Sequence, residues 1–170
     1  MHIVITGGAG FLGARLARTL LKQGPLSLAG APARPIERIT LVDRVGAPVD
    51  LASDARIATV TGDLNAQLSP DADATVWREA DAVFHLAAAV SGECEADFDL
   101  GMRSNFAATH ALLERVRALG TKPVLVFASS LAVFGDSPEQ PLPKVIEDHT
   151  LPTPQTSYGI QKFIGEQLVA

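Results

Sequence analysis

A glycine-rich segment, residues 6–13 with the sequence TGGAGFLG, constrains the fold of this chain more than any other feature. It separates a short β-branched run, His2–Thr6, from Phe11–Gln23, where apolar residues recur at helical spacing. In such a strand–loop–helix unit the first glycine permits a tight turn, the second lets the backbone approach a pyrophosphate, and the third lets the helix pack closely on the strand. The helix N-terminus then offers free N–H groups to phosphates. The expected cofactor contacts in this segment are Gly7, Gly10, Phe11, Leu12 and Gly13.

The rest of the chain alternates predicted strands with predicted helices. The further strands are expected at Arg38–Asp43, Ile57–Thr61, 82–86 and 123–128, and the further helices at 76–79, 98–119 and 157–170. In the helix over 98–119 the apolar residues that fall near one face are Phe98, Met102, Phe106, Leu113 and Val116. This alternation predicts an α/β fold, a Rossmann-type doubly wound parallel sheet with right-handed crossovers. The Ala/Gly/Pro-rich stretch 26–35 and the proline-rich stretch 137–154 are expected to be loops.

Because the sequence ends inside the last predicted helix, we expect one incomplete domain over residues 1–170, without its C-terminal strands and substrate lobe. Hydrophobic residues make up 47% of the chain and charged residues 19%, and the net charge is -5. This composition favours a cytoplasmic enzyme, with neither nucleic acid nor membrane as a partner. The single cysteine, Cys94, excludes an internal disulfide, and we expect it in a polar loop. The histidines lack metal-ligand spacing, so no metal site is predicted.

Acidic residues follow the second and third predicted strands. Asp43 stands where a carboxylate accepts hydrogen bonds from the adenosine ribose, and it would repel a 2′-phosphate. It therefore favours NAD over NADP, although the neighbouring Arg44 could pair with a phosphate and leaves NADP open. Asp63 could accept from the adenine amino group, with Leu64 packed near the ring, or it could be a simple turn aspartate.

A candidate catalytic set lies in the last third of the chain. Tyr158 and Lys162 are four residues apart at the start of a predicted helix, so they share one face. A phenol titrates near pH 10, and a nearby ammonium favours the phenolate that could act as a base. Ser129 and Ser130 follow the fifth predicted strand, at the sheet edge where α/β proteins place their sites. His85 has no evident partner in the sequence, and a buried, hydrogen-bonded histidine is the favoured interpretation.

These motifs together resemble the extended short-chain dehydrogenase/reductase superfamily, which includes the nucleotide-sugar epimerases. The resemblance is carried by TGGAGFLG, GDL at 62–64, HLAA at 85–88, FASSLAVFG at 127–135 and YGIQK at 158–162. It implies NAD as cofactor and a catalytic set of Ser130, Tyr158 and Lys162, in which Ser130 also contacts substrate while Tyr158 and Lys162 also contact NAD. It adds Leu86, Ala87, Ala88 and Asn105 to the residues near the cofactor. Phe134 departs from the tyrosine that many sugar epimerases carry there. Many relatives are dimers, so a homodimer is possible.

Two longer stretches, AAAVSGECEADFDLGMRSN at 87–105 and TPQTSYGIQK at 153–162, resemble one subgroup of this superfamily, the D-erythronate dehydrogenases. That resemblance implies oxidation of a hydroxy acid such as D-erythronate to its 2-oxo acid, a reaction of carbohydrate metabolism. It places Val90, Ser91 and Gly92 toward the substrate. Three alternatives stay open: a nucleotide-sugar epimerase or dehydratase, a non-catalytic dinucleotide sensor, and a truncated NAD-binding domain without turnover.

Overall fold

The computed structural model describes residues 1–170, which divide into two compact units. The first, called the sheet unit here, comprises Met1–Ala87 and Ala111–Ala128. The second, called the helical unit, comprises Ala88–His110 and Ser129–Ala170. No helix in the chain has both the length and the apolar character that a membrane crossing requires.

The sheet unit contains one parallel sheet of five strands in the order β3-β2-β1-β4-β5. The strands are β1 (His2–Thr6), β2 (Arg38–Asp43), β3 (Ile57–Thr61), β4 (Ala82–His85) and β5 (Val124–Phe127). In this doubly wound order the chain reverses direction across the sheet between β1 and β4, and ligands bind at the carboxyl ends of such neighbouring strands. The predicted fold class is therefore confirmed, and the five predicted strands are present within one residue of their expected bounds.

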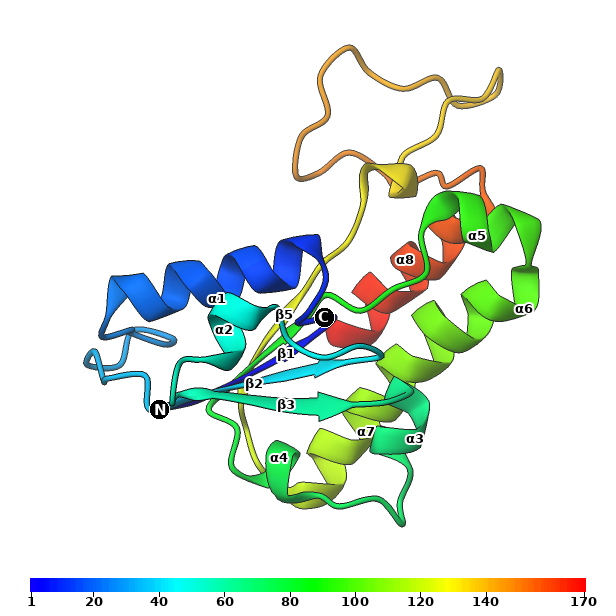
Figure 1. Cartoon of the computed structure of the whole chain (residues 1–170). Coiled ribbons are helices and arrows are strands. Elements are labelled where there is room, and N and C mark those ends of the chain that lie inside the picture. Colours follow the sequence, from blue (N-terminus) through cyan, green and yellow to red (C-terminus); the bar gives the residue numbers. More distant parts are fainter. The chain divides into compact units, whose positions relative to one another are not determined.

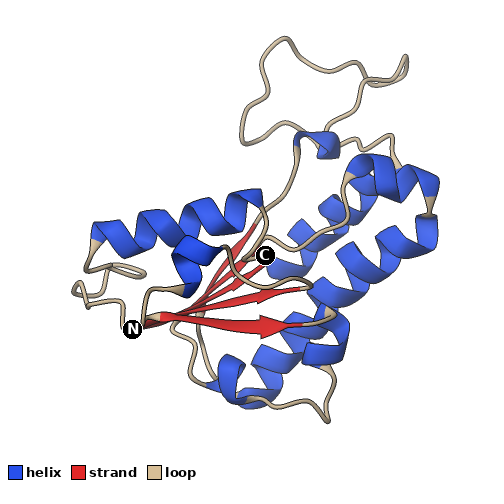
Figure 2. Cartoon of the chain, in the orientation of Figure 1, coloured by secondary structure: helices blue, strands red, loops and turns tan.

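Helices cover both faces of the sheet (Figures 1 and 2). On one face lie α1 (Phe11–Gln23) and α2 (Val49–Ala52); on the other lie α3 (Leu64–Leu68), α4 (Thr75–Arg78) and part of α7 (Ala108–Leu119). Successive residues of a strand point to opposite faces, so Ile3 and Ile5 pack in the first core and Val4 in the second. Because both faces are buried, β1 is a continuous apolar run rather than an alternating one.

The helical unit consists of α5 (Ser91–Ala96), α6 (Phe98–Gly101), the π-helix η1 (Met102–Ala107), the 3₁₀ turn η2 (Leu131–Val133) and α8 (Ser157–Val169). α8 contacts the other four elements. This unit therefore holds the predicted serine, tyrosine and lysine.

The prediction of one regular helix over residues 98–119 is wrong. The segment consists of α6, η1 and α7, and the side that it buries includes Asn105, Ala108 and Leu112, whereas Phe98 is 59% exposed. A π-helical turn has more residues per turn than an α-helix, so it shifts the face that follows it and a 3.6-residue period cannot describe both halves.

The expectation of Cys94 in a polar loop is also wrong. Cys94 lies in α5 and is 1% exposed, and its burial raises the pKa of the thiol. The sequence SGECEA has only two apolar residues, so its hydropathy gave no helical signal. Its burial depends on packing within the helical unit.

A buried histidine at the first residue of β1 makes folding stability depend on pH. His2 Nδ1 lies 3.2 Å from a guanidinium nitrogen of Arg38, and His2 Nε2 lies 2.8 Å from the Thr40 hydroxyl. Burial first, and then the charge of Arg38, lower the pKa of His2 below 6.5. The folded chain therefore keeps His2 neutral down to a lower pH than the unfolded chain, which protonates it near pH 6.5.

We expect the free energy of unfolding to be highest above about pH 6.5. It should fall as the pH drops below that value and through the folded-state pKa of His2. Urea unfolding between about pH 8 and about pH 5 measures the effect, with His2→Gln as the control because glutamine does not titrate. Equal pH dependence in the wild type and the variant would contradict this account.

Candidate active site

The glycine-rich loop joins β1 to α1 at the carboxyl edge of the sheet, within the sheet unit. Gly7 has φ +67°, and a Cβ there would lie 2.9 Å from the backbone nitrogen of Ala87. A Cβ on Gly13 would lie 2.2 Å from the carbonyl oxygen of Gly7. Glycine is therefore required at Gly7 by the turn and at Gly13 by the contact of α1 with the loop, as the sequence predicts.

Gly10 differs from these two glycines because the fold does not require it. It is the N-cap of α1 at an ordinary φ of -71°, and a Cβ there would meet only the Gly7 carbonyl oxygen, at 3.3 Å. No side chain caps α1, its first turn has no acidic residue, and Phe11 and Leu12 are 84% and 61% exposed. The bare N-terminus of α1 is thus a cradle of backbone N–H groups that a side chain would fill, which fits the pyrophosphate of a dinucleotide.

Asp43, the last residue of β2, ties this loop to the sheet. Its Oδ2 accepts a hydrogen bond from the Ala9 backbone N–H at 3.0 Å, and its Oδ1 accepts from the Arg44 N–H at 2.7 Å. The predicted ribose-binding carboxylate therefore lies beside the glycine loop. The sequence suggested the ligand role but not the second role, which is to hold the loop.

The other predicted cofactor residues of the sheet unit follow the carboxyl ends of β3 and β4. Asp63 is the N-cap of α3, with Oδ1 accepting from the Ala66 N–H at 3.2 Å, and Leu64 is the first residue of that helix. Beyond β4, the Leu86 N–H donates to the Thr6 carbonyl and the Ala87 N–H donates to the Thr6 hydroxyl, each at 3.2 Å. These contacts fix the backbone at the edge of the sheet, and the adenine contact of Asp63 stays a prediction.

His85 is the buried, hydrogen-bonded histidine that the sequence favours. Its Nδ1 lies 2.7 Å from the Thr6 hydroxyl, it is 2% exposed, and its ring is tilted against Phe127. Thr6 therefore links the end of β4 to the segment after it, a role that its β-branched character alone does not reveal.

In the helical unit, Asn105 of η1 uses its carboxamide to hold the segment that begins at Ala88. The Ala89 N–H donates to Asn105 Oδ1 at 2.8 Å, while Asn105 Nδ2 donates to the Ala89 carbonyl at 3.1 Å and to Gln161 Oε1 at 2.9 Å. Asn105 and Gln161 are 3% and 1% exposed. The predicted role of Asn105 near the cofactor stays a prediction, and its observed contacts are with protein groups.

α8 begins where the proline-rich loop ends, with the Thr156 hydroxyl accepting from the Gly159 N–H at 3.0 Å. A Cβ on Gly159 would lie 2.1 Å from the Ala132 carbonyl oxygen, so the first turn of α8 packs directly against η2. Ser130 is the N-cap of η2. The close approach therefore brings the segments of Ser130 and Tyr158 side by side.

Tyr158 and Lys162 share one side of α8, as their spacing predicts. Lys162 Nζ lies 5.9 Å from the centre of the Tyr158 ring. Lys162 is 4% exposed, and burial lowers its pKa, against a smaller opposing effect of Cys94. The buried amine of Lys162 and the ring of Tyr158 therefore lie close together on this side of α8.

The two adjacent serines after β5 have different partners. The Ser129 hydroxyl donates to the carboxylate of Glu166 on α8, whereas Ser130 Oγ accepts from the Ala132 N–H at 3.2 Å. Ser129 is thus committed to a structural contact. The hydroxyl proton of Ser130 is not used by that cap, so Ser130 can donate to a substrate oxygen.

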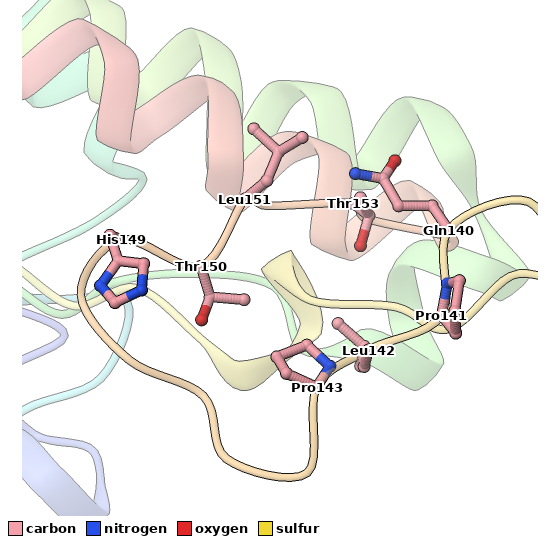
Figure 3. A pocket seen from close by; sticks show the side chains of 8 residues that line it. All are labelled: Gln140, Pro141, Leu142, Pro143, His149, Thr150, Leu151 and Thr153. Atoms are coloured by element: carbon pink, nitrogen blue, oxygen red, sulfur yellow. The ribbon is translucent and has the colours of Figure 1, made fainter.

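Ser91, predicted to contact the substrate, is the first residue of α5 and is exposed. A surface hollow of about 240 Å³ lies elsewhere in the helical unit, in the loop before α8 (Figure 3). Two arms of that loop, 140–143 and 149–153, face each other across it. None of the predicted site residues lines this hollow, so the candidate site is not there.

Comparison with known proteins agrees with this arrangement of motifs. Residues 3–170 match the model of the NAD dependent epimerase/dehydratase family. The chain is 53% identical to the D-erythronate dehydrogenase of Cupriavidus necator, in an alignment that covers 100% of this chain and 50% of that enzyme.

Solved structures show the same fold. The nucleoside-diphosphate-sugar epimerase of Agrobacterium tumefaciens matches with a TM-score of 0.80 and 42% identity, over 99% of this chain and 47% of that one. MoeE5 in complex with UDP-glucuronic acid and NAD matches with a TM-score of 0.76 and 28% identity, over 99% and 48%. The chain thus spans about half the length of these relatives. The family match over residues 3–170, together with the glycine loop on β1 and the tyrosine and lysine on α8, shows that this chain belongs to the NAD dependent epimerase/dehydratase family.

Proposed function

We propose that this chain carries the cofactor-binding and acid–base residues of an NAD-dependent oxidoreductase that oxidises a hydroxy acid, such as D-erythronate, to its 2-oxo acid. The observation that carries the proposal is the pair on α8, where the buried Lys162 lies 5.9 Å from the ring of Tyr158. The 53% identity to a D-erythronate dehydrogenase supports the choice of substrate class.

The glycine loop would hold the pyrophosphate of NAD, because the N-terminus of α1 is bare and Gly10 leaves it open. Asp43 would accept hydrogen bonds from the adenosine ribose and disfavour a 2′-phosphate. NAD, when bound, supplies the acceptor for the hydride that leaves the carbinol carbon.

The residues of the helical unit would manage the proton. Ser130 donates a hydrogen bond to the substrate hydroxyl and orients it, and the phenolate oxygen of Tyr158 takes the hydroxyl proton. Lys162, as an ammonium, stabilises that phenolate. Oxidation thus moves one proton to Tyr158 as the carbon–hydrogen bond breaks and the carbonyl forms.

A nucleotide-sugar epimerase or dehydratase is the second candidate, favoured by the 42% identity to a nucleoside-diphosphate-sugar epimerase. The two differ in net redox change, because an epimerase returns its hydride to the sugar. We expect D-erythronate to produce NADH absorbance from added NAD and UDP-sugars to produce none. NADH-free conversion of a UDP-sugar would instead establish the epimerase. Absence of turnover with both classes would contradict both candidates.

A further inference from the structure

Glu95, on α5, reaches the first turn of α8 although it lies 62 positions before Ser157 in the chain. Its Oε1 accepts hydrogen bonds from the Ser157 hydroxyl at 2.8 Å and from the backbone N–H of Tyr158 at 3.3 Å. The Tyr158 N–H is one of the N-terminal helix donors that have no partner within the helix. The carboxylate therefore binds α8 at the residue that carries the proposed base.

The charge of Glu95 suits this position. The N-terminus of a helix has a partial positive charge, which a carboxylate stabilises. The Thr156 hydroxyl already accepts from the Gly159 N–H. The side chains of Thr156 and Glu95 therefore each accept from one backbone N–H in the first turn of α8. Hydrogen bonds to an ionised acceptor are also stronger than those between neutral groups.

Glu95 can fix α8 because α5 is itself fixed. Cys94, the preceding residue, is 1% exposed; its carbonyl oxygen lies 3.1 Å from Ser157 Oγ, whose one proton it shares with Glu95, and its Sγ lies 3.2 Å from Asn105 Nδ2. Asn105 in turn donates to Gln161, one turn further along α8. α8 thus has side-chain contacts at 157–158, in the first turn that holds Tyr158, and again at 161.

From these contacts we infer that Glu95 is a positioning residue for Tyr158: its carboxylate sets where the first turn of α8 places the phenol. The inference rests on the proposed function for its effect on turnover. The inferred effect of Glu95 on the position of the phenol does not depend on the proposed function.

The test compares Glu95→Ala, which removes the acceptor, with Glu95→Gln, which keeps an acceptor oxygen. Asp99→Asn is the matched control, because Asp99 is an exposed acid on the neighbouring α6 whose carboxylate makes no hydrogen bond or ion pair with α8. We expect Glu95→Ala to lower kcat about 10- to 100-fold, the cost of a misplaced catalytic group, with KM for NAD unchanged. Glu95→Gln should recover most of that loss, and Asp99→Asn should match the wild type.

A second measurement needs no turnover. Tyr158 is the only tyrosine in the chain, so fluorotyrosine labelling gives a single fluorine resonance that reports the surroundings of its ring. We expect this resonance to move in Glu95→Ala and to stay near the wild-type position in Glu95→Gln and Asp99→Asn.

An unmoved resonance in a folded Glu95→Ala chain would overturn the inference, as would a loss of thermal stability with an unchanged kcat. A Glu95→Gln variant whose kcat is no higher than that of Glu95→Ala would also overturn the inference. If the wild type oxidises no hydroxy acid, the proposed function fails, and the fluorine resonance alone then decides the role of Glu95.

Discussion

Replacing Tyr158 with phenylalanine is expected to lower kcat by about 10²- to 10⁴-fold, the usual contribution of a general base, and to leave NAD binding nearly unchanged. The substitution removes one oxygen atom and keeps the ring. Glu95 contacts the backbone N–H of this residue rather than its side chain, so the first turn of α8 keeps its partner. NADH absorbance measures turnover, and calorimetry measures NAD affinity. A Tyr158→Phe chain with full activity would contradict the proposed mechanism.

The neighbouring serines supply the control for this prediction. Ser130→Ala removes the hydroxyl that would orient the substrate, whereas Ser129→Ala removes one that donates to Glu166. We therefore expect a large loss of kcat only in Ser130→Ala. Equal losses in both variants would show that the Ser130 hydroxyl has no special part in the chemistry.

The second large effect is expected from alanine substitutions at two glycines of the glycine-rich loop. One substitution should mainly lower stability, and the other should mainly lower NAD affinity. A Cβ on Gly13 would lie 2.2 Å from the Gly7 carbonyl oxygen and 2.7 Å from the Gly8 Cα, and backbone cannot move aside as a flexible side chain can. Gly13→Ala should therefore lower the free energy of unfolding by about 2 kcal/mol or more, measured by urea denaturation.

Gly10→Ala should lose much less stability than Gly13→Ala, because the one close contact of the new Cβ, with the Gly7 carbonyl oxygen at 3.3 Å, needs only a small backbone adjustment. Its methyl group would instead occupy the cradle at the N-terminus of α1, so NAD affinity should fall by about tenfold or more, which is about 1.4 kcal/mol. A Gly10→Ala chain that binds NAD as tightly as the wild type would show that the pyrophosphate lies elsewhere.

The fold could be predicted from the sequence because its signals are local. β1 contains the apolar run 3–5 and is followed by glycines, and α1 has apolar residues at a 3.6-residue period with Gly24 after its last turn. The π-helix η1 could not be predicted in this way. Its buried residue Asn105 makes hydrogen bonds to Ala89 and Gln161, which lie 16 and 56 positions away in the sequence.

The sequence by itself determined the strand–glycine–helix unit and the shared face of Tyr158 and Lys162, because turn sterics and helical spacing involve only neighbouring residues. Only the tertiary structure showed that Ser129 donates to Glu166, that Cys94 is buried and that Glu95 binds the first turn of α8. The two contacts join residues 37 and 63 positions apart, Ser129 with Glu166 and Glu95 with Tyr158. No local pattern records such a pair, since its partners meet only when the elements that carry them pack together.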